Sequence, residues 1–185
     1  MTDYLSSVTV GEVVAHDGPI VLAPYDPAWP SGYAALAREV SGALGNKVLL
    51  LEHVGSTSVP GLCAKPIIDM VLAVADSSDE AAYVRALEAV GFKLKIREPD
   101  WYGHRMLKAP SIDGNLHVFS AGCEEIGRML RFRDWLRSRE EDRRAYEAKK
   151  RELAARRWKH IQDYADAKTG IVKEILARAF SPVGG

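Results

Sequence analysis

A glycine and hydroxyl loop and a lone strand carboxylate are the parts of this sequence whose residue types and spacing best fit chemistry. Residues 55–58 read Gly-Ser-Thr-Ser after an apolar run, and Asp69 follows inside a second apolar run over residues 67–74. Glycine allows a tight turn, and hydroxyl and N–H groups in such a turn can converge on an anion. The loop has neither the GxxxxGK[ST] nor the GxGxxG spacing. A carboxylate in an apolar strand is either paired or metal-bound, or it faces solvent beside an arginine.

Length and composition limit the class of protein that carries these residues. The chain has 185 residues, of which 47% are hydrophobic and 27% charged, and its 25 basic and 25 acidic residues give a formal net charge of zero. This length predicts a single domain that buries a hydrophobic core. A neutral chain has no field that would draw it to nucleic acid or to a membrane. Cys63 and Cys123 lack metal-site spacing, and there is no membrane-spanning run or signal-peptide core, so we expect a soluble cytoplasmic protein.

Hydrophobic periodicity predicts a mixed α/β core followed by helices. Strands are expected where short apolar runs end in turn residues, and helices where apolar residues recur every three or four positions. In chain order, the expected elements are a helix from Asp26-Pro27 to Leu44, strands over 48–51 and 67–74, a helix from Ser78 or Asp79 to Val90, strands over 92–96, 103–109 and 115–120, and three helices between Glu124 and Phe180 with breaks near Ser138-Arg139 and within 157–162. Residues 9–14 could add a short edge strand.

Strand alternation sorts the residues of the run 115–120 into two faces. Leu116 and Val118 fall on one face, while Asn115, His117 and Phe119 fall on the other. The two runs 103–109 and 115–120 are joined by a Pro- and Gly-containing segment, which predicts a hairpin.

Several motifs in this order resemble the GrpB family, a bacterial group with the nucleotidyltransferase fold. The resemblance covers roughly residues 19–180, nearly the whole chain. The motifs are PYDPAWP at 24–30, EHVGSTSVPGLCAKPIIDMVLAV at 52–74, LHV at 116–118, FRDWL at 132–136 and YADAKT at 164–169. We therefore expect an N-terminal extension (1–18), one domain (19–180) with a nucleotidyltransferase-like α/β core (19–122) and a helical cap (123–180), and a tail (181–185).

The resemblance also implies roles for the strand residues. In the superfamily, two carboxylates two residues apart and a third on an adjacent strand hold divalent metal. Here Asp69 matches the first, Val71 stands at the second position, and His117 best matches the third. Three alternatives stay open: one Mg²⁺ on Asp69 and substrate phosphates; a softer metal such as manganese, zinc or nickel on Asp69, His117 and either His53 or His104; or binding without catalysis.

Phosphate ligands are expected from the loop and from cations on the helices. In the resembled fold the loop Gly55, Ser56 and Thr57 cradles phosphate, and Lys65 precedes the Asp69 strand. Lys149 shares a helix face with Tyr146 and Leu153, and Lys168 shares one with Tyr164, Ile171 and Ile175. With Arg133, these two lysines would form a cationic lid; alternatively, each cation is a solvated surface residue. Glu52 is expected to pair with an arginine.

Two functions follow from the resemblance. One is an enzyme that uses a divalent metal (Mg²⁺ or Mn²⁺, with zinc or nickel as alternatives) to transfer a nucleotidyl group from a nucleoside triphosphate to a small acceptor. The other is a non-catalytic nucleotide- or metal-binding module, or a folding helper like the extra domain attached to some dephospho-coenzyme A kinases. Val71 distinguishes these two functions: its side chain cannot bind a metal, which favours the non-catalytic module.

Overall fold

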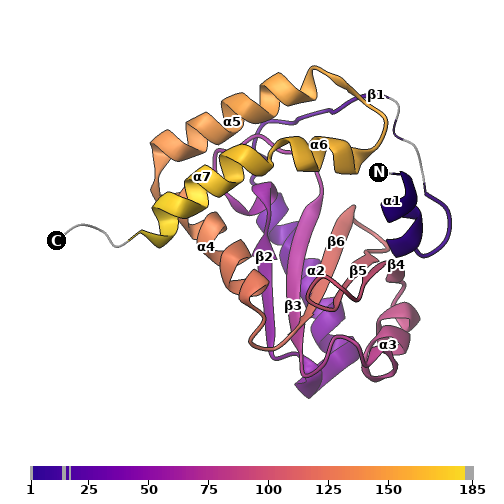
Figure 1. Ribbon diagram of the computed structural model, residues 1–185. Coiled ribbons are helices and arrows are strands. Elements are labelled where there is room, and N and C mark those ends of the chain that lie inside the picture. The colour runs from indigo at the N-terminus through magenta and orange to yellow at the C-terminus, as the bar shows by residue number, and fades with distance from the viewer. Residues whose placement is uncertain (1, 14–15, 17, 182–185) are drawn as a thin grey trace.

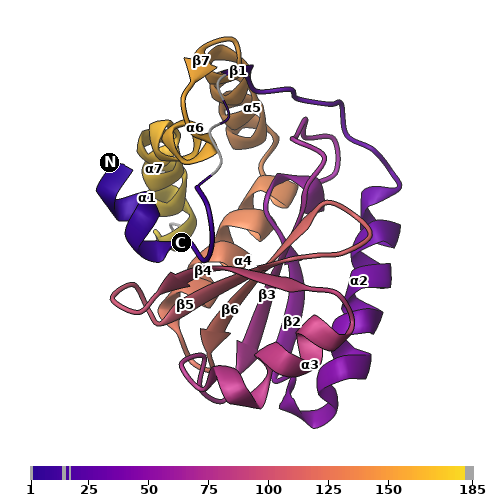
Figure 2. The same ribbon diagram turned by 90° about the vertical axis from the view of Figure 1, so that its right-hand side faces the viewer.

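The protein is built around one mixed β-sheet, seen in a computed structural model that describes residues 2–13, 16 and 18–181 (Figures 1 and 2). The helices are α1 (Thr2–Val8), α2 (Trp29–Leu44), α3 (Val84–Ala89), α4 (Glu124–Ser138), α5 (Glu140–Ala154), α6 (Ile161–Ala167) and α7 (Thr169–Phe180). The strands are β1 (Gly18–Pro19), β2 (Leu50–Val54), β3 (Ile68–Val74), β4 (Lys93–Glu98), β5 (His104–Lys108), β6 (Gly114–Ser120) and β7 (Arg157–Trp158). Short 3-10 turns are η1 (Gly45–Lys47), η2 (Ser56–Ser58) and η3 (Glu80–Ala82).

The five-stranded sheet has the order β2-β3-β6-β5-β4. Its central pair, β3 and β6, is parallel, and the other neighbouring strands are antiparallel. In the parallel pair Asp69 lies opposite Asn115 and Val71 lies opposite His117. Because side chains alternate along a strand, Asp69 and His117 share one face of the sheet. The architecture predicted from the sequence, a mixed α/β sheet followed by a helical bundle, is confirmed.

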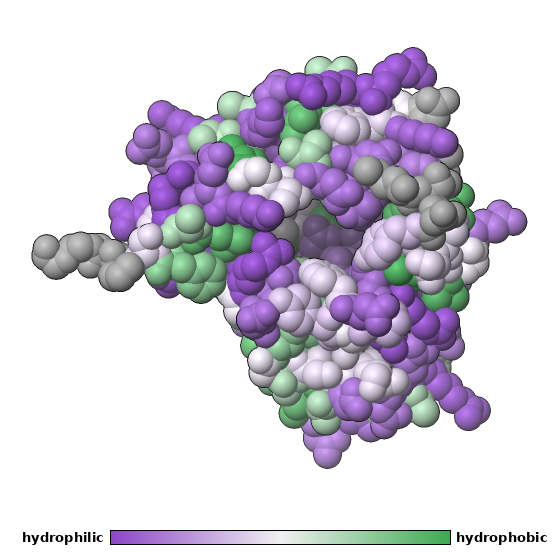
Figure 3. Space-filling view, viewed as in Figure 1, coloured by the Kyte–Doolittle hydropathy of each residue, from purple (hydrophilic) through white to green (hydrophobic). Residues whose placement is uncertain are grey.

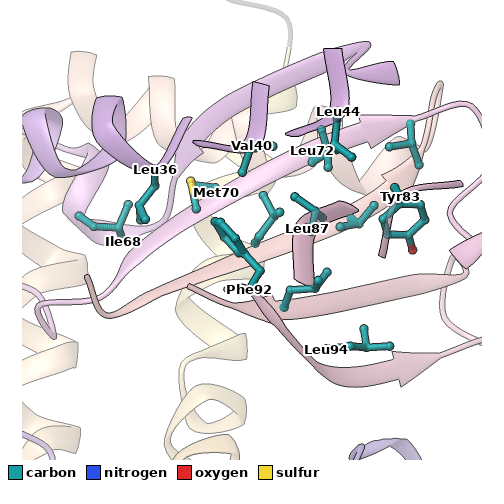
Figure 4. Close-up of a cluster of buried hydrophobic side chains, with 14 of the residues drawn as sticks. Leu36, Val40, Leu44, Ile68, Met70, Leu72, Tyr83, Leu87, Phe92 and Leu94 are labelled. Atoms are coloured by element: carbon teal, nitrogen blue, oxygen red, sulfur yellow. The ribbon is translucent and has the colours of Figure 1, made fainter. Parts of the chain in front are cut away.

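The main core lies on the opposite face of the sheet, under α2 and α3 (Figure 4). Alternate apolar residues of β3 and β6 point there, and α2 buries an apolar stripe at helical spacing against them. The buried set includes Leu36, Val40, Leu44, Ile68, Met70, Leu72, Leu87, Phe92, Leu116 and Val118. This arrangement confirms that Leu116 and Val118 face away from His117.

On the Asp69 face, helices of the C-terminal half cover only part of the sheet. Val71, Ala73 and Phe119 pack beneath Ile126 of α4. Asp69 and His117, which precede these residues on β3 and β6, remain partly exposed. Helices α5, α6 and α7 extend beyond this end of the sheet (Figures 1 and 2). Strands β1 and β7 form a separate antiparallel pair, which holds Gly18 and Pro19 against the connection between α5 and α6.

Several predicted boundaries are wrong in detail. The first long helix begins at Trp29 instead of at Asp26-Pro27, because the Asp26 carboxylate accepts a hydrogen bond from the Ala28 N–H at 2.8 Å and closes a local turn first. The strand predicted over 48–51 is β2, shifted toward His53. The helix predicted from Ser78 or Asp79 divides into η3 and the short α3.

The termini also differ from the predictions. Within the described part of residues 9–14, the chain makes only an isolated bridge between Thr9 and Ile96, after the unpredicted helix α1; residue 14 lies outside the described residues. The last predicted helix is two helices, α6 and α7, which meet at Lys168. Thr169 and Gly170, both poor helix formers, follow that junction.

Candidate functional site

Asp69 and His117 face each other at the edge of the cleft between the sheet and the terminal helices. The Nε2 atom of His117 lies 3.9 Å from Oδ1 of Asp69, and the two side chains keep 23% and 31% of their exposure. Asn115, opposite Asp69 in the register, donates an amide hydrogen bond to Oδ1 at 2.8 Å. Burial raises the pKa of Asp69, but His117, Asn115 and the charge of Lys65 outweigh it, so the pKa lies below its ordinary value. The carboxylate is therefore ionised at neutral pH.

The glycine and hydroxyl loop lies directly against this carboxylate. Gly55 has φ +69°, and a Cβ at this position would lie 2.5 Å from Oδ2 of Asp69. The hydroxyl of Thr57 donates to the Ile67 carbonyl at 3.1 Å, and the hydroxyl of Ser58 donates to the Gly55 carbonyl at 2.6 Å. Both hydroxyls thus stabilise the loop, while Ser56 lines the adjoining cavity with its side chain hydrogen-bonded to that of Tyr146.

Of the other two candidate metal-ligand histidines, His104 contacts His117 instead of Asp69. Its Nε2 lies 3.0 Å from Nδ1 of His117, and its Nδ1 lies 2.6 Å from Oε2 of Glu98. Burial lowers the pKa of His104, although Glu98 opposes the shift. With both ring nitrogens engaged, His104 orients His117 and has no nitrogen left for a cation beside Asp69.

His53 is engaged elsewhere. Its Nε2 lies 3.0 Å from the Thr57 hydroxyl, and its ring stacks on Tyr33 with 4.8 Å between the ring centroids. Burial lowers the pKa of His53 to about 4, so the imidazole is neutral. In the part of the chain that the structure describes, no three His, Cys, Asp or Glu side chains form a ready metal cluster.

Four lysines line a cavity of about 440 Å³ above Asp69 and His117, seen as a hydrophilic hollow between the helices and the sheet (Figure 3). Lys108 pairs with Asp113 at 2.6 Å, whereas Lys65, Lys150 and Lys168 contact Tyr164 or Cys63. Lys65 and Lys168 lie on the ring of Tyr164, with Nζ 5.8 Å and 4.4 Å from its centroid. The Lys150 ammonium, on a residue only 2% exposed, donates to the Cys63 carbonyl. Burial lowers the pKa of Lys150 to about 7 and that of Lys168 to about 8. An anion in the cavity would stabilise the charged form of all three.

Lys150 is the site residue that the sequence interpretation missed. Lys149, which was expected to face the body of the protein, pairs instead with Glu152, at 2.8 Å, on the outer side of α5. The buried face of α5 contains Tyr146, Lys150 and Leu153. These positions are four and three residues apart, so helical spacing suits Lys150 as well as Lys149, and this spacing was the signal available in the sequence.

Arg133 does not form a lid over the cavity. Its Nη1 donates to Oε2 of Glu52 at 2.7 Å and to the buried carbonyl of His53 at 2.9 Å. Arg133 therefore ties α4 to β2, away from the lysines. The expected ion pair between Glu52 and an arginine is confirmed.

A second hollow adjoins the cavity and shares Lys168 with it. This groove of about 700 Å³ is lined by Trp101 and Tyr102 on one side and by residues of α7, including Lys173 and Phe180, on the other. Tyr102 has φ +55°, the one positive φ at a non-glycine residue in the described part of the chain. Such a conformation is uncommon and is found at functional sites more often than elsewhere.

The Asp69 and His117 side chains fit a single divalent cation. A zinc ion bonds carboxylate oxygen and imidazole nitrogen at about 2.1 Å each, and the 3.9 Å between Oδ1 and Nε2 leaves room for one such ion between them. A mixed oxygen and nitrogen donor pair favours manganese, zinc or nickel over magnesium. Two protein ligands leave the remaining positions for water or for oxygens of a bound ligand.

The chain is similar in sequence and in structure to several known proteins. A UPF0157 protein from Halalkalibacterium halodurans is 58% identical over 177 residues, covering 96% of this chain and 91% of the relative. The crystal structure of the GrpB protein from Enterococcus faecalis matches with a TM-score of 0.72 and 30% identity, covering 87% of this chain and 100% of the other. Fainter likenesses, with TM-scores of 0.41 to 0.43, are to the Cid1 poly(U) polymerase and to an RNA terminal U-transferase.

A larger protein also contains a similar region. The dephospho-CoA kinase of Mycolicibacterium paratuberculosis is 27% identical over 190 residues, which cover 88% of this chain and 46% of that protein. In the described residues of this chain, no helix combines the length and the apolar composition needed to cross a bilayer. The family model described as GrpB protein matches residues 19–178. This chain therefore belongs to the GrpB family.

Proposed function

We propose that this protein binds a nucleoside triphosphate in the lysine-lined cavity and transfers its nucleotidyl group to a small acceptor with the help of a divalent cation. The observation that carries the proposal is the convergence of Lys65, Lys150 and Lys168 on a cavity that also contains Asp69 and His117. A triphosphate carries several negative charges, and ammonium groups in a partly buried cavity bind them more strongly than they would in water.

Each group around the cavity has a role in this proposal. Asp69 and His117 would hold the cation, which when bound neutralises phosphate charge and lowers the pKa of an attacking hydroxyl. His104 keeps the ring of His117 in place. The lysines stabilise the charge that develops on the leaving pyrophosphate. The aromatic-sided groove that shares Lys168 would take the nucleoside or the acceptor.

A second candidate, a non-catalytic nucleotide-binding or accessory module, is favoured by Val71. This residue is fully buried beneath α4, and the strand position that follows Asp69 on the same face therefore offers no oxygen to a second cation. The similarity to part of a dephospho-CoA kinase supports an accessory role as well. In this reading the cavity holds the phosphates of a ligand without cleaving them.

Isothermal titration calorimetry with ATP, GTP, CTP and UTP, with and without Mg²⁺ or Mn²⁺, tests both candidates. We expect cation-dependent binding that Asp69→Asn abolishes and that the exposed control Asp76→Asn retains. A pyrophosphate-release assay with the bound nucleotide and a panel of small hydroxyl and amine acceptors then separates them. Tight cation-dependent binding without pyrophosphate release supports the accessory module. Absence of binding by all four nucleotides would falsify the nucleotide proposal.

A further inference from the structure

The groove between α7 and the turn at Trp101 and Tyr102 is lined by aromatic rings that the fold does not bury. Trp101 and Tyr102 keep 38% and 44% of their exposure, and Phe180 on the other wall keeps 60%. Figure 3 shows apolar residues gathered on α7, to the left of the hydrophilic hollow. Large exposed apolar side chains that share one hollow indicate a ligand site, whereas scattered ones do not.

The aromatic wall is held in place before any ligand arrives. The Trp101 ring makes edge contacts with Tyr102 and Phe119, with centroids 5.6 Å and 5.7 Å apart. The hydroxyl of Tyr102 donates to the carboxylate of Glu124, at the start of α4. The positive φ of Tyr102 belongs to the same wall, and backbone strain of this kind is concentrated at ligand sites. A positioned wall loses little conformational entropy on binding.

The charges in the groove are mostly positive. Lys168 and Lys173 line it, together with Arg128 and Glu125 of α4. Glu125 is only 3% exposed, and its two carboxylate oxygens accept hydrogen bonds from Nε and Nη2 of Arg128 at 2.5 Å and 2.6 Å. Among the described residues, Nη1 of Arg128 has no hydrogen-bond partner. Exposed rings beside surplus cations fit a planar aromatic compound that carries an anionic group.

A small pocket of about 150 Å³ joins the groove to the centre of the site. Asp69 and His117 line this pocket, which shares Arg128 and Val172 with the groove. The lysine-lined cavity reaches the same pair between other elements, namely α1, α6, β4 and β5. Two hollows thus lead to Asp69 and His117, one along α4 and α7 and the other beneath the lysines.

Transfer of a nucleotidyl group needs two such approaches. The hydroxyl or amine of the acceptor forms a bond to the α-phosphorus and gives its proton to solvent, while the bond to the β-phosphate breaks and pyrophosphate leaves. Attack and departure are roughly in line, so the two partners occupy different sides of the reacting phosphate. With the pyrophosphate on the lysines, the pocket beside Arg128 is the approach for the acceptor.

We propose that the groove is the acceptor site and that it takes a planar aromatic compound carrying a carboxylate or a phosphate. Trp101 and Tyr102 would contact the ring, and Lys173 and Arg128 would bind the anionic group. The role as acceptor rests on the proposed function, whereas the binding of such a compound to the groove does not. The alternative occupant, the nucleoside of the donor, is an outcome of the test.

Titration calorimetry of the full-length protein with 1-naphthoate and 1-naphthyl phosphate, without nucleotide or metal, tests the binding. The matched ligands are 1-naphthamide, which is neutral, and cyclohexanecarboxylate, which has no aromatic ring. We expect an aromatic anion to bind about 10-fold more tightly than either matched ligand, because each of these lacks the charge-assisted hydrogen bonds or the ring contacts. The tighter of the two aromatic anions identifies the anionic group. Binding of neither would overturn the proposal.

Ala177→Trp localises the binding to the groove. Ala177 is an exposed residue of the groove lining, so an indole at this position fills the hollow and should abolish the binding of 1-naphthoate. Glu174→Trp is the matched control, because Glu174 is exposed on the same helix but does not line the groove; it should retain the wild-type affinity. Unchanged binding by a folded Ala177→Trp protein would place the compound elsewhere and overturn the proposal.

The cation in the groove has its own pair of variants. Lys173→Gln should weaken the binding of 1-naphthoate by about two- to five-fold, since an exposed ion pair contributes up to about 1 kcal/mol. Lys149→Gln, which removes a lysine on the outer side of α5, should leave it unchanged. Equal effects of the two substitutions would contradict the assigned anion contact.

A competition experiment separates the acceptor from the nucleoside. The nucleotide that binds in the test of the proposed function is held at saturation with Mn²⁺, and 1-naphthoate is titrated again. Unchanged affinity supports the acceptor site, and competitive displacement would assign the groove to the nucleoside and overturn the acceptor role. If no nucleotide binds at all, the proposed function fails while the titrations of the ligand-free protein still decide whether the groove binds an aromatic anion.

Discussion

Gly55 and Asp69 approach so closely that no side chain fits between them: a Cβ on Gly55 would lie 2.5 Å from Oδ2 and 2.9 Å from Cβ of Asp69. The loop backbone therefore forms one wall of the carboxylate site. The left-handed φ of +69° at Gly55 brings the chain into this position, and glycine adopts it without strain. The carboxylate and the loop thus form a single unit.

Gly55→Ala is expected to destabilise the protein and displace Asp69. The strained φ alone costs about 1–3 kcal/mol, and the clash with the carboxylate adds to it. Chemical denaturation measures the loss in the free energy of unfolding. Gly42→Ala is the matched control: a Cβ at this position in α2 meets nothing within 4 Å, so we expect a gain of about 0.5–1 kcal/mol from helix propensity. Equal effects of the two substitutions would contradict the proposed contact.

Lys150 and Lys149 are adjacent on α5 and should differ sharply in ligand binding. Lys150→Ala removes an ammonium from the cavity, and loss of a hydrogen bond to a charged group weakens triphosphate affinity by about 10- to 100-fold. Lys149→Ala removes only a surface pair with Glu152 and should leave the dissociation constant within a factor of two or so. Titration calorimetry of both variants with the same nucleotide decides between the two lysines. A larger loss for Lys149→Ala would reverse the assignment.

Lys150 should also make stability depend on pH. Its pKa is about 7 in the folded protein and 10.5 as the ordinary value, so between these limits the unfolded chain binds more protons than the folded one. The unfolding free energy of the wild type relative to Lys150→Met should therefore rise between pH 7 and 9.5, by up to about 1.4 kcal/mol per pH unit. Below pH 7 the difference should be flat. Lys149→Met, at the neighbouring position on the outer side of α5, is the control variant in the same series of urea titrations.

Arg133→Met is expected to lower stability without changing nucleotide affinity. The substitution leaves the buried His53 carbonyl without its donor, which costs about 1–3 kcal/mol. Arg144→Met is the control, because the Arg144 side chain is 79% exposed and pairs with Glu140 along its own helix; its effect should stay within about 0.5 kcal/mol. Thermal denaturation and calorimetry on the same samples separate the two properties. Weaker nucleotide binding by a folded Arg133→Met protein would show that Arg133 belongs to the cationic lid over the phosphates.

Val71→Asp restores the second carboxylate position in sequence but should not create a two-cation site. Val71 is fully buried in the apolar cluster under α4. Its neighbour on β6, His117, is already hydrogen-bonded to His104, so the new carboxylate would be desolvated without a dedicated cation and is expected to cost about 3–5 kcal/mol. The same change at Val21, which is 75% exposed, should be nearly neutral. A stable Val71→Asp protein that binds two Mn²⁺ ions in place of one would show that the strand can turn this residue to the cleft.

The strand residues of the site were predictable because their signals are local. Apolar runs define β3 and β6, and alternation with period two places Asp69 on one face of its strand and His117 opposite Leu116 and Val118. Their proximity also required that the two strands be neighbours, which the family resemblance implied; that they pair in parallel is a finding of the structure. Together these two sources gave the centre of the site.

The cations were not predictable to the same degree. On a helix, neighbouring residues differ by about 100° around the axis. That Lys150 points inward is decided by tertiary contacts, such as its hydrogen bond to the Cys63 carbonyl. Arg133 meets Glu52 across 81 positions of sequence, and no local pattern indicates such a partner. The same holds for Tyr4 and Glu98, whose side chains are hydrogen-bonded only once α1 has docked on the sheet.

The parallel pairing of β3 and β6 has a consequence for how the site comes into being. Antiparallel neighbours can form early from short turns, whereas this pair closes only when the whole segment between the two strands has crossed over. In a partly folded chain whose hairpins have formed but whose β3 and β6 are not yet paired, the Asp69 carboxylate and the His117 imidazole are not yet close to each other. Under the proposed function, loss of ligand binding would therefore report incomplete folding before secondary structure is lost.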